Sequence, residues 1–229
     1  MIAPNSNCYW CGAAPAGREH VPPQTLFPKA KKVNLITVPA CRSHNQDLSK
    51  LDEKFRVFLQ ALDPSPDAVA EFASRTFRGL NRPESAGLVK GLAAAAHPVV
   101  IQGKKTFAFA IDPSEQALYF EKMFRALYFH LYNSPFEGFV SSFSPQFVTP
   151  NLDYGELALR LESIFADQSI WRDGATSNRD IFHFRYTQIA PEPEVPMVIL
   201  LTFYTSIQVV GFLTGSSPDG GQTEAAITV

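Results

Sequence analysis

Cysteine is scarce in this chain, which has three cysteines in 229 residues and none after Cys41. An odd count argues against a disulfide framework and indicates a reducing compartment, so we expect a cytoplasmic protein. A thiol-redox function of the Cys8-x-x-Cys11 pair would need a surrounding βαβ pattern, which this segment lacks. Thiolates bound to a metal ion fit the composition better than disulfides do.

The chain also lacks a long uninterrupted apolar segment. Its longest apolar run, at 195–213, contains proline, glutamine and several hydroxyl side chains and is rich in β-branched residues. This pattern predicts two buried strands rather than a membrane span. The first ten residues show neither a basic nor an apolar targeting region, so we expect no secretory signal peptide and no membrane partner.

Neither sign of charge is in strong excess, because 20 Lys and Arg face 22 Asp and Glu. The distribution is uneven: residues 1–60 hold eight basic and four acidic side chains (+4), and residues 61–229 hold twelve and eighteen (−6). A segment of +4 does not by itself indicate nucleic-acid binding. The basic excess nevertheless coincides with the segment that holds all the cysteines.

Those cysteines have the spacing of metal ligands. The chain contains a Cys-x-x-Cys pair, Cys8 and Cys11, and a Cys-x-x-His pair, Cys41 and His44. Three thiolates and a neutral imidazole match the borderline-soft Zn²⁺ ion and make a standard tetrahedral shell. One zinc ion held by both pairs would stabilise a subdomain of about 60 residues, whose own core is marginal. We therefore predict a structural zinc site.

Short extended stretches at 18–26 and 33–39, broken by prolines, precede an amphipathic helix that begins at Asn45. The segment 63–67 (DPSPD) has the composition of a linker. Later elements are predicted as two short helices in 66–96, a hairpin in 97–113, a helix over 113–135, an irregular segment at 134–152, a helix over 154–168 and antiparallel strands in 179–190, 196–204 and 206–215.

Three segments of the first part are CYWCG at 8–12, REHVPPQTLFP at 18–28 and NLITVPACRSHNQDLSK at 34–50. Together they resemble the HNH endonucleases, also called ββα-metal or His-Me finger nucleases, over residues 8–56. The chain is similar to the HNN-type members that carry a structural zinc ion. The resemblance implies a hairpin that carries a histidine and an asparagine, and a following helix that carries the last metal ligand.

Carried over to this sequence, the resemblance implies that His20 is the general base, Asn34 is the middle asparagine and Asn45 holds the catalytic metal ion. Glu19 stands where many members have a metal-binding aspartate. The implied reaction is hydrolysis of DNA phosphodiester bonds with Mg²⁺ or another divalent ion, because hard cations prefer oxygen ligands. A neutral imidazole at pH 7 suits proton abstraction from water. The expected phosphate contacts are Lys29, Lys31, Lys32, Arg42 and Lys50.

The expected fold is α+β, with two parts. Residues 1–62 would form a zinc-bound ββα-metal (HNH) subdomain, and residues 63–229 a helical segment followed by an antiparallel-sheet α+β domain of unknown role. The second part could form a homodimer or bind a protein partner.

Two alternatives stay open. In one, His44 binds the catalytic metal ion and the zinc ion keeps only three ligands. In the other, the zinc-stabilised fold is catalytically inactive and binds nucleic acid or protein.

Overall fold

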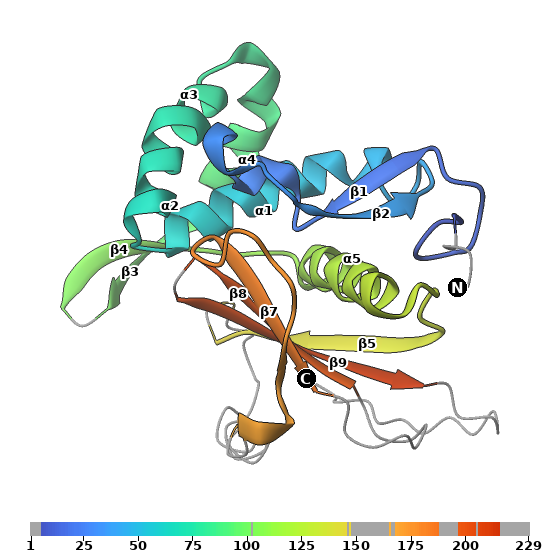
Figure 1. Ribbon diagram of the computed structural model, residues 1–229. Helices are drawn as coiled ribbons and strands as arrows, with labels where there is room; N and C mark the ends of the chain where they lie inside the picture. The colour runs from blue at the N-terminus through green and yellow to red at the C-terminus, as the bar shows by residue number, and fades with distance from the viewer. Residues whose placement is uncertain are drawn as a thin grey trace.

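The computed structural model describes residues 6–101, 103–145, 147, 165, 168–187, 197–204 and 206–215, and it is mixed α+β with antiparallel sheets (Figure 1). The expected fold class is confirmed at that level. Within the described residues, no helix is both long enough and apolar enough to cross a membrane.

The N-terminal unit is a two-stranded antiparallel hairpin followed by a helix. Strand β1 (Gly17–Val21) pairs with β2 (Ile36–Ala40), and α1 (Ser49–Leu62) follows after a short 3₁₀ helix at Gln46–Leu48. Two further 3₁₀ helices, Gln24–Leu26 and Lys29–Lys31, fill the long hairpin connection, each preceded by a proline. Prolines suit the start of a helical turn because their fixed φ fits it and no N–H donor is needed there. The order of the elements agrees with the ββα expectation.

Alternation along the hairpin divides its side chains between two faces. Successive side chains of a strand point to opposite sides. Glu19 and Val21 are buried, whereas Arg18 is exposed and His20 is half-buried. In β2, Ile36, Val38 and Ala40 are buried. The buried face packs toward α5 (Pro113–Tyr132), which contacts both strands.

The middle of the chain is helical, as expected. The π-helical turn Phe72–Thr76 joins α2 (Pro66–Glu71) to α3 (Phe77–Leu80), and α4 (Ala86–Ala95) follows a 3₁₀ turn at Pro83–Ser85. Strands β3 (Ala96–Ile101) and β4 (Lys104–Phe109) form the predicted hairpin, which projects from the rest of the molecule (Figure 1). Asp112 caps α5 by accepting a hydrogen bond from the Ser114 amide.

The second sheet has five antiparallel strands in the order β5-β9-β8-β7-β6. Helix α5 covers one face of this sheet (Figure 1). At Gly211 an added Cβ would lie 2.4 Å from the Phe124 ring, so only glycine permits this close approach. The strands are β5 (Gly138–Phe143), β6 (Arg172–Asp173), β7 (Phe182–Thr187), β8 (Met197–Phe203) and β9 (Ile207–Gly215).

The irregular segment expected at 134–152 is wrong over residues 138–143, which form edge strand β5 beside β9. Local sequence did not reveal it, because its serines hide the apolar alternation and its partner lies some 70 positions later along the chain. The three C-terminal strands are confirmed, and β6 was not anticipated. The helix predicted over 154–168 lies largely outside the described residues.

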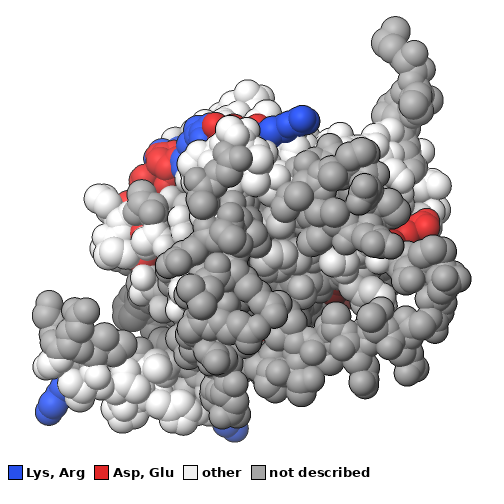
Figure 2. All heavy atoms as spheres, turned by 90° about the horizontal axis from the view of Figure 1, so that it is seen from below, with Lys and Arg blue, Asp and Glu red and all other residues white. Residues whose placement is uncertain are grey.

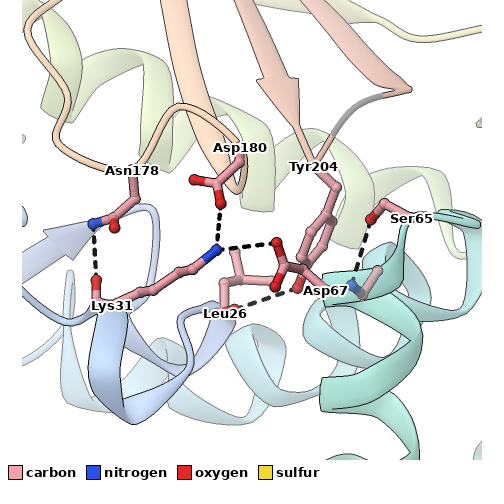
Figure 3. Close-up of polar contacts among 8 residues, drawn as sticks. Leu26, Lys31, Ser65, Asp67, Asn178, Asp180 and Tyr204 are labelled. Carbon is pink, nitrogen blue, oxygen red and sulfur yellow. Dashed lines mark hydrogen bonds and ion pairs between the residues drawn. The ribbon is translucent and has the colours of Figure 1, made fainter.

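The predicted boundary after residue 62 does not coincide with a break in the core, because one cluster of buried side chains extends from Cys8 to Leu213. The segment predicted to be a linker packs instead: the Asp63 carboxylate accepts hydrogen bonds from Ser65 and Ser206. Figure 3 shows a second connection, in which the Lys31 ammonium lies between the carboxylates of Asp67 and Asp180.

Two more hydrogen bonds in Figure 3 join the hairpin connection to the C-terminal sheet region. The Asn178 amide donates to the Lys31 carbonyl at 2.8 Å, and the Tyr204 hydroxyl donates to the Leu26 carbonyl at 3.3 Å. The segment between β1 and β2 is therefore held to the C-terminal sheet region at Leu26 and Lys31.

Candidate metal centre and the adjoining histidine

The structure brings the four predicted zinc ligands into one cluster. Their ligand atoms all lie within 4.8 Å of one another in the Cys₃His cluster, defined as Cys8, Cys11, Cys41 and His44. The His44 Nδ1 atom lies 3.6 Å from the Cys8 sulfur and 3.2 Å from the Cys41 sulfur, and the Cys11 and Cys41 sulfurs are 3.9 Å apart. Tetrahedral zinc bonds of about 2.0–2.3 Å place neighbouring ligands about 3.5–3.8 Å apart. The cluster therefore fits one zinc ion.

The backbone around Cys8 has the shape that a metal-binding turn requires. The Gly12 amide donates to the Cys8 carbonyl at 3.0 Å, and Gly12 adopts a φ of 70°, which glycine accepts without strain. Burial opposes ionisation of the Cys8 thiol, but hydrogen bonds from the Cys11, Cys41 and Trp10 backbones outweigh it and lower its pKa. The turn thus favours the thiolate, which is the metal-binding form.

The imidazole of the cluster is held by aromatic and cationic neighbours. The Trp10 ring stacks on His44 with centroids 4.6 Å apart, and the Arg125 guanidinium lies 5.2 Å from the Trp10 centroid. Burial lowers the pKa of His44, and the positive charge of Arg125 lowers it further, so the neutral ligand form is favoured. Arg125 also donates to the Phe136 and Gly138 carbonyls, which ties the cluster to α5 and β5. The sequence had suggested no role for Arg125.

His20, the predicted general base, lies on the hairpin face opposite the buried one. It is half-buried and shares its face with Arg18, about 7 Å away along the strand. The Arg18 guanidinium is fixed by hydrogen bonds of 2.9 Å to the hydroxyl and the carbonyl of Thr37, which is the cross-strand partner of His20. Burial lowers the pKa of His20, and the charges of Lys32 and Arg18 lower it further. Both effects favour the neutral imidazole, which is the form that can accept a proton.

Asn45, the predicted holder of the catalytic metal ion, lies at the edge of β1. Its side-chain Nδ2 donates to the Arg18 carbonyl at 3.1 Å. Because a carbonyl only accepts hydrogen bonds, this contact fixes the amide with its nitrogen toward β1 and leaves Oδ1 facing away. Arg18 thus links the two predicted residues: its carbonyl contacts Asn45, and its charge acts on His20.

Asn34, the predicted middle asparagine, is exposed and adopts the left-handed conformation with a φ of 52°. Asparagine tolerates this region better than most residues, so a turn role explains its identity. Among the described residues, Asn34 and His20 share no hydrogen bond. Asn34 instead lines a shallow pocket between the hairpin and the loop at 176–178.

Glu19 faces the core. Its carboxylate lies 3.1 Å from the buried Lys122 ammonium on α5, which also contacts Asp52 on α1. Burial raises the pKa of Glu19 to about 7, against the lowering effect of Lys122. Because the Glu19 side chain is only 3% exposed and points away from His20, it does not fit the predicted role of a ligand to a solvent-accessible Mg²⁺ ion.

The predicted phosphate contacts fall into three groups. Lys29 and Lys50 are exposed, and Arg42 is exposed with Asp47 3.5 Å away. Lys31 is held by Asp67 and Asp180, which does not fit a phosphate contact. Lys32 is half-buried near His20. The described residues therefore offer fewer free cations than the sequence had suggested.

The positions of these side chains do not form a Mg²⁺ site held by the protein alone. Protein sites for Mg²⁺ use one or two carboxylates together with substrate phosphates and water. Among the described residues, the group of three or more His, Cys, Asp or Glu side chains that could hold a metal ion is the Cys₃His cluster, and Glu19 is committed to Lys122. The donor set does not fit a Mg²⁺ ion held by the protein alone.

We predict that the purified chain binds about one zinc ion and that Cys41→Ser loses it, because a thiolate is removed from the shell. Elemental analysis and thermal melting measure both effects. Ser43→Ala, two positions away and exposed, serves as the control and should keep its zinc. A folded wild-type protein without metal would contradict the assignment.

A second prediction concerns Glu19. Because its pKa is raised from 4.5 to about 7, the folded state binds a proton more tightly than the unfolded state does. The free energy of unfolding should therefore fall as pH rises from about 4.5 to about 7. Glu19→Gln should remove part of this fall, on the order of 1–3 kcal/mol. Urea unfolding at pH 5 and pH 8 measures it.

The exposed Glu84→Gln serves as the control and should follow the wild type at both pH values. The thiolates of the Cys₃His cluster take up protons alike in the wild type, Glu19→Gln and Glu84→Gln. A difference in the pH dependence of unfolding between the wild type and Glu19→Gln therefore reports on Glu19. An identical pH dependence for wild type and Glu19→Gln would show that the buried carboxyl does not titrate there.

Comparisons of the chain with known protein families, curated proteins and solved structures found no match. The HNH resemblance therefore depends on the residues quoted from the sequence. The geometry establishes, independently of any relative, a Cys₃His cluster able to hold a metal ion such as zinc, next to the hairpin that carries the half-buried His20.

Proposed function

We propose that this protein hydrolyses phosphodiester bonds in DNA, with His20 as the general base. The observation that carries the proposal is the surroundings of His20. The side chain is half-buried, burial and two cations lower its pKa, and it lies on a hairpin whose connection is hydrogen-bonded at Leu26 and Lys31. Neutral histidine near cations is the arrangement that proton abstraction next to a phosphate requires.

The proposed chemistry uses residues of the chain. The neutral His20 imidazole takes a proton from water, and the resulting hydroxide attacks the phosphorus atom. The bond from phosphorus to one deoxyribose oxygen breaks, and this leaving oxygen takes up a proton from solvent. Arg18 and Lys32 carry the positive charge that offsets the negative charge growing on the phosphate oxygens. The Thr37 contacts hold Arg18 in one orientation, so little side-chain entropy is lost when a phosphate binds.

In this proposal the zinc ion is structural. A Cys₃His shell fills all four tetrahedral positions and leaves none for substrate or water. Asn45 follows His44 directly, so binding of His44 to the metal also fixes where the Asn45 amide meets the edge of β1. A divalent ion for the reaction, which the resemblance implies, would have to arrive with the substrate phosphates.

The nucleic acid is proposed to bind on the side of His20. On the face shown in Figure 2, Lys and Arg side chains lie next to Asp and Glu along the upper left margin, and separate basic side chains lie at the lower edge. Alternating charge of this kind does not attract a polyanion over distance. A homodimer or protein partner through residues 63–229 stays a prediction.

A specific observation favours a second candidate, the catalytically inactive binding module. Glu19 is engaged with Lys122, so the metal-binding carboxylate that the resemblance implies is missing from the site. In that case the cations around His20 would bind a phosphate backbone without cutting it. A cleavage assay separates the two candidates.

The proposal predicts that the zinc-loaded protein nicks plasmid DNA with Mg²⁺ or Mn²⁺ present. His20→Ala should reduce the rate about 10²–10⁴-fold, because the general base is removed, with unchanged zinc content and melting temperature. His97→Ala, on the exposed β3 strand, is the control and should cut as the wild type does. Undiminished cutting by His20→Ala would show that another group is the base.

A further prediction uses the pH profile of cleavage. Activity should fall at acid pH as His20 becomes protonated, at a pH below the ordinary histidine range. Lys32→Gln removes a charge that lowers the pKa of His20, so the acid limb of kcat should move to higher pH. Lys50→Gln, exposed on the first turn of α1, should leave the limb in place. A limb that Lys32→Gln does not move would argue against His20 as the titrating base.

A further inference from the structure

A second group of cations lies next to the His20 site, where α1 meets the π-helical turn Phe72–Thr76. Helix α1 contacts this turn and also the 3₁₀ helix Gln24–Leu26 of the hairpin connection. The Thr76 hydroxyl donates to the Gln60 side-chain oxygen and joins the two helical segments. Arg56 lies one helical turn before Gln60, so both side chains share one face of α1.

Arg56 is buried in this group without a full set of partners. The residue is 8% exposed, and among the described residues its Nε atom has no hydrogen-bond acceptor. Its ion pair with Glu53 is long, at 3.8 Å, and the Glu53 side chain is 46% exposed. The Gln60 amide nitrogen is likewise buried without an acceptor among the described residues. Unpaired buried donors are costly, and oxygen atoms of a bound anion would satisfy them.

Arg75 adds a second guanidinium from the π-helical turn. Its Nη1 atom donates to the Phe27 carbonyl at 3.4 Å, and its nearest carboxylate, Glu71, lies 3.9 Å away. The hydrogen bond to Phe27 places Arg75 against the hairpin connection, and the charge of Arg75 acts on Lys32 in the same connection. The Arg75 side chain remains about one-third exposed, so a ligand in solvent can reach it.

Positive charges outnumber negative ones in this group. Burial lowers the pKa of Lys32, and the charges of Arg75, Lys29 and Arg56 lower it further, while Glu71 opposes them. Burial lowers the pKa of Arg56, and the charge of Arg75 lowers it further. Four cations therefore face two carboxylates, Glu53 and Glu71. Mutual repulsion of this kind is relieved when an anion binds.

Lys32 connects this group to the proposed catalytic histidine. The Lys32 charge lowers the pKa of His20, and the charges of Arg75 and Arg56 lower the pKa of Lys32. A single polyanion crossing the surface would therefore meet His20 and Arg18 at one point and the arginines at the next. A basic group continuous with His20 fits a strand of nucleic acid better than it fits an isolated small anion.

We propose that Arg56, Arg75 and Lys32 form a subsite for a backbone phosphate of the nucleic acid. This phosphate would lie next to the one that is attacked by the water activated by His20. The choice of nucleic acid as the source of this phosphate rests on the proposed function. Guanidinium groups suit this task because their planar N–H donors match phosphate oxygens in pairs. The buried Arg56 orients the phosphate, and the accessible Arg75 and Lys32 neutralise it.

The test is binding of a fluorescently labelled DNA oligonucleotide to the zinc-loaded full chain, followed by anisotropy over a range of salt concentrations. The His20→Ala background prevents cleavage, so binding is measured separately from catalysis. Arg75→Gln should weaken binding about tenfold or more and reduce the slope of log K against log salt by about 1. Arg56→Gln should weaken binding similarly, and its melting temperature shows whether the variant folds.

Arg78→Gln is the matched control, because Arg78 is exposed one position into α3 and its Nε donates to the Ser74 carbonyl. It should bind DNA within about twofold of the His20→Ala parent, with an unchanged salt slope. Equal losses of DNA affinity for Arg75→Gln and Arg78→Gln would show that DNA is attracted by general positive charge, and would overturn the subsite. Binding by Arg75→Gln equal to that of the parent would overturn it as well.

The outcomes also separate the subsite from the proposed reaction. If Arg75→Gln weakens DNA binding but the wild-type protein does not cut DNA, the subsite is supported and the proposed hydrolase activity is overturned. Cleavage by the wild type together with undiminished binding by Arg75→Gln overturns the subsite alone. A wild-type protein that binds no DNA overturns both.

Discussion

Convergence of Cys8 and Cys11 with Cys41 and His44 is the constraint on which the N-terminal unit depends. Cys8 and Cys11 precede β1 in the sequence, and Cys41 and His44 follow β2. Because the four ligand atoms lie within 4.8 Å of one another, the start of β1 and the end of β2 are held together. A bound zinc ion would contribute roughly 10–16 kcal/mol of apparent folding free energy to such a unit. The position of the next residue, Asn45, at the edge of β1 follows from this closure.

The hairpin separates structural and chemical roles through strand alternation. On one face, Glu19 joins Lys122 and Asp52 and holds β1 against α5 and α1. On the other face, Arg18 and His20 lie side by side, and Lys32 adds its charge from the hairpin connection. The buried ion pairs therefore hold the strand whose outer face presents the histidine.

The sequence revealed what depends on local spacing. The two x-x pairs predicted the Cys₃His cluster, and helical periodicity predicted α1 and α5. It did not reveal contacts between distant segments. Strand β5 depends on β9 for its existence, and Lys31 appeared free because its acceptors, Asp67 and Asp180, lie 36 and 149 positions away. Glu19 appeared to be a metal ligand because its ammonium partner lies on α5.

The arginines near His20 illustrate the same limit. In the sequence, Arg56 belongs to an amphipathic helix and Arg75 to a helical segment beyond the predicted linker, and neither is close to a recognisable motif. Only the packing of α1 against the π-helical turn brings them toward Lys32. The family resemblance predicted a metal-binding carboxylate, whereas the structure offers a cationic environment around the histidine.

Hydrogen exchange of the zinc-loaded and the chelator-treated protein tests most directly whether the metal ion organises the histidine-bearing hairpin. We predict that removing the metal speeds amide exchange in Gly17–Val21 and Ile36–Ala40, while the central strands Met197–Phe203 and Ile207–Gly215 keep most of their protection. Equal protection of the hairpin with and without the metal ion would contradict the account.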